Sequence, residues 1–163
     1  MSNGQSLSFL IVDDDEDDRL LIEDAFLECA MANQRDYAAD GVEMLQYLRA
    51  EGKWVGRPTS QMPSLILLDL NMPRMDGRRA LAHLKNDPIL RYIPVIVLTT
   101  SRSDEDKLRA YDLGATSFIL KPVTFDAIMK LVQVLDCYWA THVELPKLPE
   151  YVRRAAAESQ SAA

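Results

Sequence analysis

Three continuous apolar runs, each the length of a buried β-strand, restrict the fold of this sequence more than any other feature. They read LSFLIV (residues 7–12), SLILLDL (64–70) and PVIVLTT (94–100). Apolar runs without polar alternation are typical of strands covered on both faces in a parallel sheet. Parallel neighbours need a crossover connection, which is usually a helix. We therefore expect an α/β fold in which the intervening stretches supply the helices.

The stretches between these runs contain the remaining predicted elements. Two weaker strands are expected at 35–40 and 116–120, and helices at 17–31, 41–50, 77–86, 103–113 and 124–139. Strict alternation of this kind predicts one parallel sheet with helices on both faces. Residues 7–140 would form this domain, and 141–163 a C-terminal extension that is partly disordered or associated with a dimer.

Composition and charge argue against several functions. The net charge of −7 disfavours nonspecific nucleic-acid binding, because a protein that follows phosphates needs a basic face. No apolar run approaches the roughly 18 residues of a membrane span. Cys29 and Cys137 are too few for a disulfide or metal framework, and we interpret both as small buried hydrophobes. We expect a cytoplasmic protein that binds neither nucleic acid nor membranes.

Polar side chains stand where the predicted strands end. Asp13 and Asp14 follow the first run, Asp69 and Thr99 end the next two, and Lys121 follows the last short strand. Ligands of open α/β sheets bind outside the carboxyl ends of the strands. The fold should therefore bring three carboxylates, a hydroxyl and an ammonium to one edge of the sheet.

The chemistry of this cluster points to phosphoryl transfer. Three neighbouring carboxylates repel one another unless a cation joins them, and Mg²⁺ prefers a few carboxylates together with waters and phosphate oxygens. A cation, a lysine and a hydroxyl can neutralise a transferring phosphoryl group. A carboxylate can itself be the nucleophile. These groups would therefore suffice for a Mg²⁺-dependent phosphoryl transfer that gives an aspartyl phosphate.

At these residues the sequence resembles the receiver domain of two-component response regulators. The matching motifs are VDD (12–14), LLDLNMPRMDG (67–77), LTTS (98–101) and FILKP (118–122). The resemblance implies a flavodoxin-like (βα)5 three-layer sandwich with the parallel strand order 2-1-3-4-5. It also implies a phosphoacceptor for a sensor histidine kinase rather than an enzyme, with self-catalysed phosphotransfer and dephosphorylation.

The resemblance assigns a metal role to four residues. Asp14 and Asp69 would bind Mg²⁺ through their side chains, and Asn71 through its backbone carbonyl. Asp13 would contribute through a water. Asp69 would also be the phosphoacceptor.

The resemblance assigns the remaining residues to the phosphoryl group and to a switch. Lys121 would pair with Asp69 or the phosphoryl group, and Thr99 would donate a hydrogen bond to a phosphoryl oxygen. Phe118 would change its packing in response, although many receivers have tyrosine there. The peptide bond between Lys121 and Pro122 would be cis, which X-Pro bonds adopt at small cost.

A closer resemblance is to single-domain response regulators of bacterial and cyanobacterial phytochrome kinases. It depends on the loop at 52–63 and on the tail YWATHVELP (138–146). It implies a phytochrome-type kinase as partner and a homodimer formed by helix 4, strand 5 and helix 5, at about 103–140, with the extension. About 25 residues after the receiver are too few for an output domain, so the output would be a changed protein–protein contact.

Several alternatives remain open at this point. The protein could be a phosphorelay intermediate or a chemotaxis-type regulator with a different kinase. A Mg²⁺-dependent phosphatase with an aspartyl nucleophile is less favoured, because Asn71 stands where such enzymes have a second acid. A flavin module is disfavoured too, because DDDEDD (13–18) repels phosphate without a metal.

The other conspicuous side chains have structural interpretations. The acidic residues 15–18 should start the first helix, where negative charge is favourable. Trp54 and Trp139 are expected to pack in the fold, and Trp139 to be available to an interface. We expect solvent around three arginines near the third helix, Arg74, Arg78 and Arg79.

Overall fold

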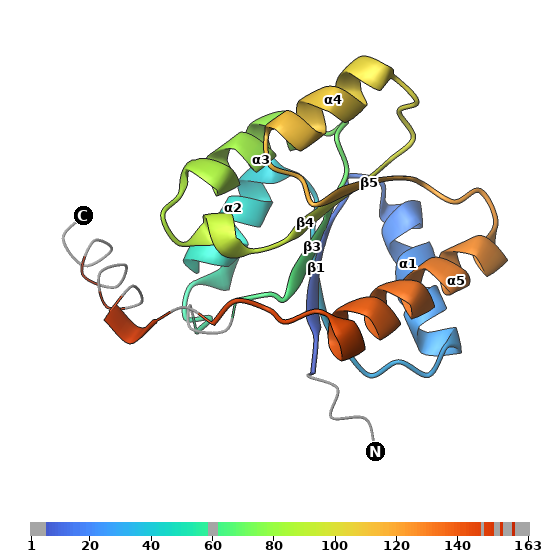
Figure 1. Ribbon diagram of the computed structural model, residues 1–163, viewed down its shortest axis with the longest axis horizontal. Coiled ribbons are helices and arrows are strands. Elements are labelled where there is room, and N and C mark those ends of the chain that lie inside the picture. Colours follow the sequence, from blue (N-terminus) through green and yellow to red (C-terminus); the bar gives the residue numbers. More distant parts are fainter. Residues whose placement is uncertain (1–5, 59–61, 148, 152–153, 155–157, 159–163) are drawn as a thin grey trace.

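A five-stranded parallel sheet in the order β2-β1-β3-β4-β5 forms the centre of the molecule (Figure 1). The computed structural model describes residues 6–58, 62–147, 149–151, 154 and 158. The strands are β1 (Ser8–Val12), β2 (Gln34–Ala38), β3 (Leu65–Leu68), β4 (Val95–Thr99) and β5 (Ser117–Leu120). The predicted flavodoxin-like architecture and its strand order are confirmed.

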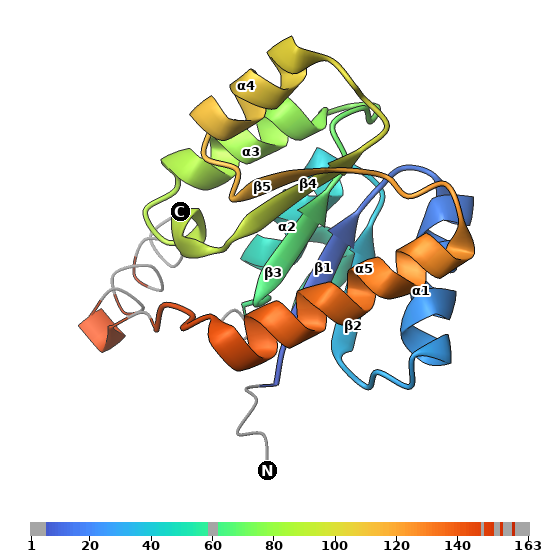
Figure 2. The same ribbon diagram turned by 45° about the vertical axis from the view of Figure 1, so that its right-hand side comes forward.

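Helices cover both faces of the sheet (Figures 1 and 2). One face carries α1 (Glu16–Glu28) and α5 (Phe125–Cys137), and the other α2 (Gly41–Arg49), α3 (Gly77–Asn86) and α4 (Asp104–Asp112). Short 3₁₀ turns η1 (Gly52–Trp54) and η2 (Leu90–Tyr92) lie in the connections.

Each face of the sheet has its own apolar core because side chains of a strand alternate in direction. On β1, Leu10 and Val12 join the core beneath α2 and α3. Phe9 and Ile11 join the core beneath α1 and α5. All four side chains are almost fully buried. This double burial explains why the central strands read as unbroken apolar runs.

The helices α1 to α5 begin in the same way. In each, the side chain of the N-cap residue accepts a hydrogen bond from a backbone N–H of the first turn, which would otherwise have no partner. The capping residues are Asp15, Asp40, Asp76, Ser103 and Thr124. The prediction that the acidic run starts the first helix is thus confirmed at Asp15.

The chain continues past α5 as a single π-helical turn, η3 (Tyr138–His142). Trp139 is buried in the core beneath α1 and α5, as predicted for a packing residue. Val143 and Leu145 pack against the same core, so the beginning of the extension is attached to the domain. The prediction that 141–163 is partly disordered lies in part outside the residues that the structure describes.

Two expectations about the chain after β5 are wrong. The bond between Lys121 and Pro122 is trans, the isomer that X-Pro bonds favour by about 0.5–1 kcal/mol. Cys137 is exposed because it lies on the outer side of the last turn of α5, whereas Cys29 is half-buried against the core. In the described part of the chain, no helix is long and apolar enough to span a membrane.

Candidate functional site: a carboxylate cluster at the ends of β1 and β3

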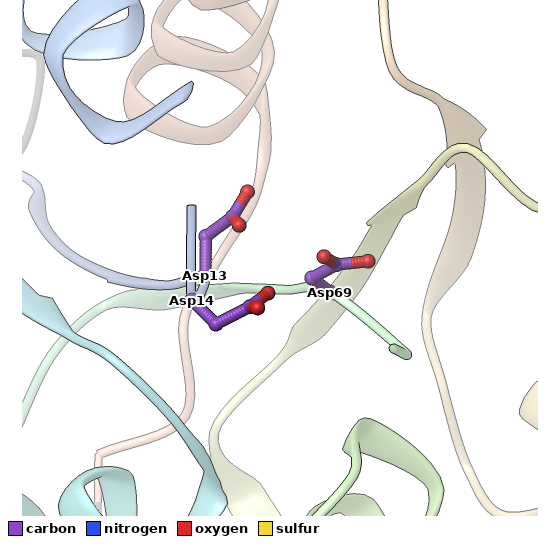
Figure 3. A group of neighbouring side chains, drawn as sticks. All are labelled: Asp13, Asp14 and Asp69. Carbon is purple, nitrogen blue, oxygen red and sulfur yellow. The ribbon is translucent and has the colours of Figure 1, made fainter. Parts of the chain in front are cut away.

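Three aspartates meet at the carboxyl edge of the sheet (Figure 3). Asp13 and Asp14 follow β1, and Asp69 follows β3. The backbone N–H of Asp69 donates to the carbonyl of Val12 at 2.9 Å, which holds the two strand ends side by side. One carboxylate oxygen from each aspartate lies within 4.8 Å of the others. The prediction that these three residues meet at one edge of the sheet is confirmed.

The donor set of this cluster fits a hard divalent cation. Carboxylate oxygens are the ligands that Mg²⁺ prefers, and among the described residues this is the group whose acidic side chains could hold a metal ion. Asp13 and Asp69 are buried, while Asp14 is exposed, so a cation here would keep contact with water. Asn71 lies two positions after Asp69 in the β3–α3 loop and is exposed.

Lys121 extends from the end of β5 into the cluster. Its Nζ lies 2.7 Å from Oδ2 of Asp13 and 3.2 Å from Oδ2 of Asp69. A third carboxylate, Asp18 in the first turn of α1, accepts from Nζ at 2.8 Å. Sequence reasoning missed this contact and gave Asp18 only a helix-starting role. The signal in the sequence that could have predicted this contact is the place of Asp18 in the first turn of a helix that begins at this edge of the sheet.

Burial and charge shift the ionisation of the central pair. Burial raises the pKa of Asp13 above its ordinary value, and the hydrogen bond from Lys121 opposes that shift without cancelling it. For Lys121, burial alone would lower the pKa, but the hydrogen bonds to Asp13 and Asp18 together raise it above its ordinary value. Lys121 therefore remains an ammonium at neutral pH.

Thr99 begins a chain of hydrogen bonds that runs to α4. Its side chain is fully buried, and its Oγ1 accepts from the backbone N–H of Ser101 at 3.3 Å. Ser101 Oγ in turn donates to Asp106 Oδ2 at 2.6 Å. Asp106 also pairs with Arg78 of α3 at 2.6 Å. Because this arginine is largely buried, the expectation of a solvated Arg78 is wrong.

Phe118 lies on β5 beside β4. It pairs with Val97 in the register of the two strands and packs, half-buried, against the core beneath α2 and α3. Val97 and Thr99 are two residues apart on β4, so their side chains point to the same face of the sheet. Phe118, the partner of Val97, therefore lies on the same side of the sheet as Thr99. The backbone N–H of Phe118 donates to Tyr111 Oη of α4 at 3.2 Å.

The loop after β3 folds tightly against Asp69. Gly77 donates its N–H to the Leu70 carbonyl at 2.8 Å. A Cβ at Gly77 would lie 2.1 Å from the Asp69 carbonyl oxygen, a distance that no side chain tolerates. Arg74, in a left-handed conformation, pairs with Asp40 at 2.6 Å and fastens the loop to the start of α2. The close approach to Asp69 therefore requires glycine at position 77.

A doubly wound parallel sheet with an acidic cluster and a lysine at its carboxyl edge defines a class of phosphoryl-handling domains. Within that class, residues 9–133 match the response regulator receiver domain. The chain belongs to this family.

Two curated proteins are similar to this chain over most of its length. Response regulator Rcp1 of Synechocystis is 34% identical over 137 residues, which are 84% of this chain and 91% of the relative. The probable methanogenesis regulatory protein FilR2 of Methanothrix harundinacea is 38% identical over 131 residues, 80% of this chain and 81% of the relative.

Two solved structures of similar proteins are a phosphorylated phytochrome response regulator and a metal-bound response regulator. The phosphorylated cyanobacterial phytochrome response regulator RcpA superposes with a TM-score of 0.78 at 34% identity, covering 88% of this chain and all of that one (100%). The Mn²⁺-bound form of Rcp1 superposes with a TM-score of 0.75 at 33% identity, covering 86% and 99% of the two chains.

Proposed function

We propose that this protein is a single-domain response regulator that accepts a phosphoryl group on Asp69 in a Mg²⁺-dependent reaction. One observation supports the proposal above the others. Asp69 is a buried carboxylate that shares a three-aspartate cluster and also lies 3.2 Å from the ammonium of Lys121. This is the set of charges that a transferring phosphoryl group requires around its acceptor.

The reaction follows from the placement of Asp69. One of its carboxylate oxygens forms the new P–O bond while the P–N bond to the kinase's phosphohistidine breaks, and the electron pair stays on the imidazole nitrogen. Mg²⁺, when bound by Asp14, Asp69 and the Asn71 carbonyl with Asp13 behind a water, supplies charge neutralisation. The ammonium of Lys121 offsets the remaining negative charge. The product is an aspartyl phosphate that water can hydrolyse.

The response to phosphorylation would begin at Thr99. Its hydroxyl would turn to donate to a phosphoryl oxygen, and Phe118 would repack on the same face of the sheet. The hydrogen bonds from Thr99 through Ser101 to Asp106 offer a route from this movement to α4. The protein would thus act as a switch rather than an enzyme that turns over a substrate.

The partner that we propose is a sensor histidine kinase of the phytochrome type. The names of RcpA and of other relatives support this choice, while the relative FilR2 is named a probable methanogenesis regulatory protein. Transfer from such a kinase would take place in the cytoplasm. Phosphotransfer profiling against purified kinases of the same genome tests the partner: a phytochrome-type kinase should transfer fastest, and equal or faster transfer from another kinase would contradict the choice.

The surface of α4, β5 and α5 supports a homodimer. It exposes several large apolar side chains, and exposed apolar patches are typical of protein–protein interaction sites. They are Leu108, Tyr111, Leu120, Val123, Phe125, Val134 and Tyr138. We propose that a second copy of the chain covers this surface and that the C-terminal extension contributes to the same interface.

A charge placed on that surface tests the dimer. Leu108 on α4 is 68% exposed, so Leu108→Glu should leave the fold intact and reduce the mass measured by light scattering to that of a monomer. Leu27→Glu is a matched control, because Leu27 is 61% exposed on α1 outside the proposed surface. A wild-type monomer, or equal effects of both substitutions, would contradict the dimer.

Intact-mass spectrometry tests the proposed phosphorylation. Incubation with acetyl phosphate and Mg²⁺ should add one phosphoryl group to the wild-type chain, and a chelator should prevent it. Asp69→Asn should abolish the addition, while Asp24→Asn, an exposed acid of α1, should not. Unchanged phosphorylation of Asp69→Asn would reject the assignment.

A further inference from the structure

Lys121 holds three carboxylates at once. An ammonium has three N–H donors, and its Nζ lies 2.7 Å from Asp13, 2.8 Å from Asp18 and 3.2 Å from Asp69. The lysine side chain is only 12% exposed, so water contributes little to its solvation. The three donors are therefore matched by three acceptors, two that directly follow β1 and β3 and one in α1.

The three acceptors differ in what else they can bind. Asp13 and Asp69 belong to the carboxylate cluster that fits a cation, whereas Asp18 does not. The side chains of Asp13 and Asp69 are only 3% and 8% exposed, while the Asp18 side chain is 35% exposed. A cation at the cluster would use Asp69 directly and Asp13 through a water, and would leave Asp18 to the lysine.

Cation binding creates a conflict that Asp18 can resolve. A divalent ion beside Asp13 and Asp69 repels a nearby ammonium, and the repulsion is strong in a partly buried site. The ammonium then stays at the site only if it has a hydrogen-bond acceptor that the cation does not use. Asp18 is such an acceptor, and its contact with Nζ is shorter than that of Asp69.

We infer that Asp18 is a positioning residue, which retains the ammonium of Lys121 at the site and thereby frees Asp13 and Asp69 to bind a divalent cation. This inference deepens the proposed function, on which it rests for the identity of the cation site. Without the Asp18 carboxylate, the charged partners left to Lys121 among the described residues are Asp13 and Asp69. It then competes with the cation for both.

The expected consequence is weaker cation binding in Asp18→Asn. Losing the one charge-assisted acceptor that holds Lys121 aside should weaken Mg²⁺ binding by about fivefold to tenfold. The matched control is Asp17→Asn, because Asp17 lies in the same first turn of α1, carries the same charge and is exposed. It should change Mg²⁺ affinity by less than about twofold, the size of a screened surface charge. Asp18→Glu should restore most of the affinity.

The test is a calorimetric titration of the full chain with Mg²⁺ in the absence of any phosphodonor. It is repeated in a Lys121→Met background, where Asp18→Asn should have no more effect than Asp17→Asn, because the lysine that Asp18 positions is gone. Thermal unfolding of each variant checks that all are folded. Equal affinities of Asp18→Asn and Asp17→Asn, or a full Asp18→Asn effect without Lys121, would overturn the inference.

A phosphorylation assay adds a signature that a merely structural role would not produce. In Asp18→Asn the Mg²⁺ concentration needed for half-maximal phosphorylation should rise, while the rate at saturating Mg²⁺ stays within about twofold of wild type. An equal fall of the rate at every Mg²⁺ concentration would contradict positioning through Lys121. Because the calorimetry needs no phosphodonor, it can reject this inference even if Asp69 is phosphorylated, and support it even if Asp69 is not.

Discussion

Arg78 of α3 and Asp106 of α4 form an ion pair of 2.6 Å, with the arginine side chain only 17% exposed. The second oxygen of Asp106 accepts from Ser101 in the loop that follows β4. The hydrogen bonds from Ser101 and Arg78 lower the pKa of Asp106 below its ordinary value, so its carboxylate stays charged near neutrality. This pair ties α4 both to its neighbouring helix and to the loop beside Thr99.

Breaking this pair should loosen α4. In Asp106→Asn we expect amide hydrogen exchange in α4 (Asp104–Asp112) to accelerate by up to about fivefold, because a partly exposed ion pair contributes at most about 1 kcal/mol. Glu105→Gln removes the same charge from an exposed neighbour in the same turn and should leave exchange unchanged. Equal exchange in the two variants would show that the pair does not hold the helix.

The ion pair between Glu23 and Arg35 should make stability depend on pH in the acidic range. Arg35 donates two hydrogen bonds to Glu23, at 2.6 and 2.8 Å, and these lower the pKa of the carboxyl below its ordinary value of 4.5. A lowered folded-state pKa stabilises the protein above the unfolded value and loses that contribution as the pH falls through the folded value.

The measurement compares Glu23→Gln with wild type by urea unfolding at several pH values. At pH 7 the variant should be less stable by about 1 kcal/mol, and the difference should shrink below about pH 4.5, the ordinary value. Glu28→Gln, an exposed acid in the last turn of the same helix, is the control. A difference that is constant with pH would argue against the lowered pKa.

Gly77→Ala should destabilise the domain and displace Asp69. The added Cβ would meet the Asp69 carbonyl oxygen at 2.1 Å, and backbone atoms at a strand end cannot yield easily. We expect a loss of about 3 kcal/mol of unfolding free energy, the upper range for an overpacked site. Gly56→Ala has open space around its Cβ and only a positive φ to strain it, so it should lose about 1 kcal/mol. Similar losses in both variants would contradict the close approach.

The sheet and the position of the acidic cluster followed from the sequence because both depend on local patterns. Unbroken apolar runs predicted buried parallel strands, and the rule that strand ends meet at one edge brought Asp13, Asp14 and Asp69 together. The N-cap at Asp15 is likewise a local signal. Each of these inferences needed only the residues next to a strand or helix end.

The contacts that sequence reasoning missed join elements distant in the chain. Asp18 reaches Lys121 across 103 positions, and Arg78 reaches Asp106 across 28. An acidic or basic residue at a helix start is usually solvated, so the sequence alone favoured a solvent-exposed position for both Asp18 and Arg78. Which of these charges become partners is determined by tertiary packing, in which α1 lies beside α5 and α3 beside α4.

Identification of the modified residue is the decisive test of phosphorylation at Asp69. Borohydride reduces an acyl phosphate to an alcohol, so an aspartyl phosphate formed with Mg²⁺ and acetyl phosphate becomes homoserine at its own position. Peptide mass spectrometry should find homoserine at position 69, dependent on Mg²⁺ and absent from Asp69→Asn. Homoserine at another aspartate, or none in a chain that has gained a phosphoryl group, would contradict the account.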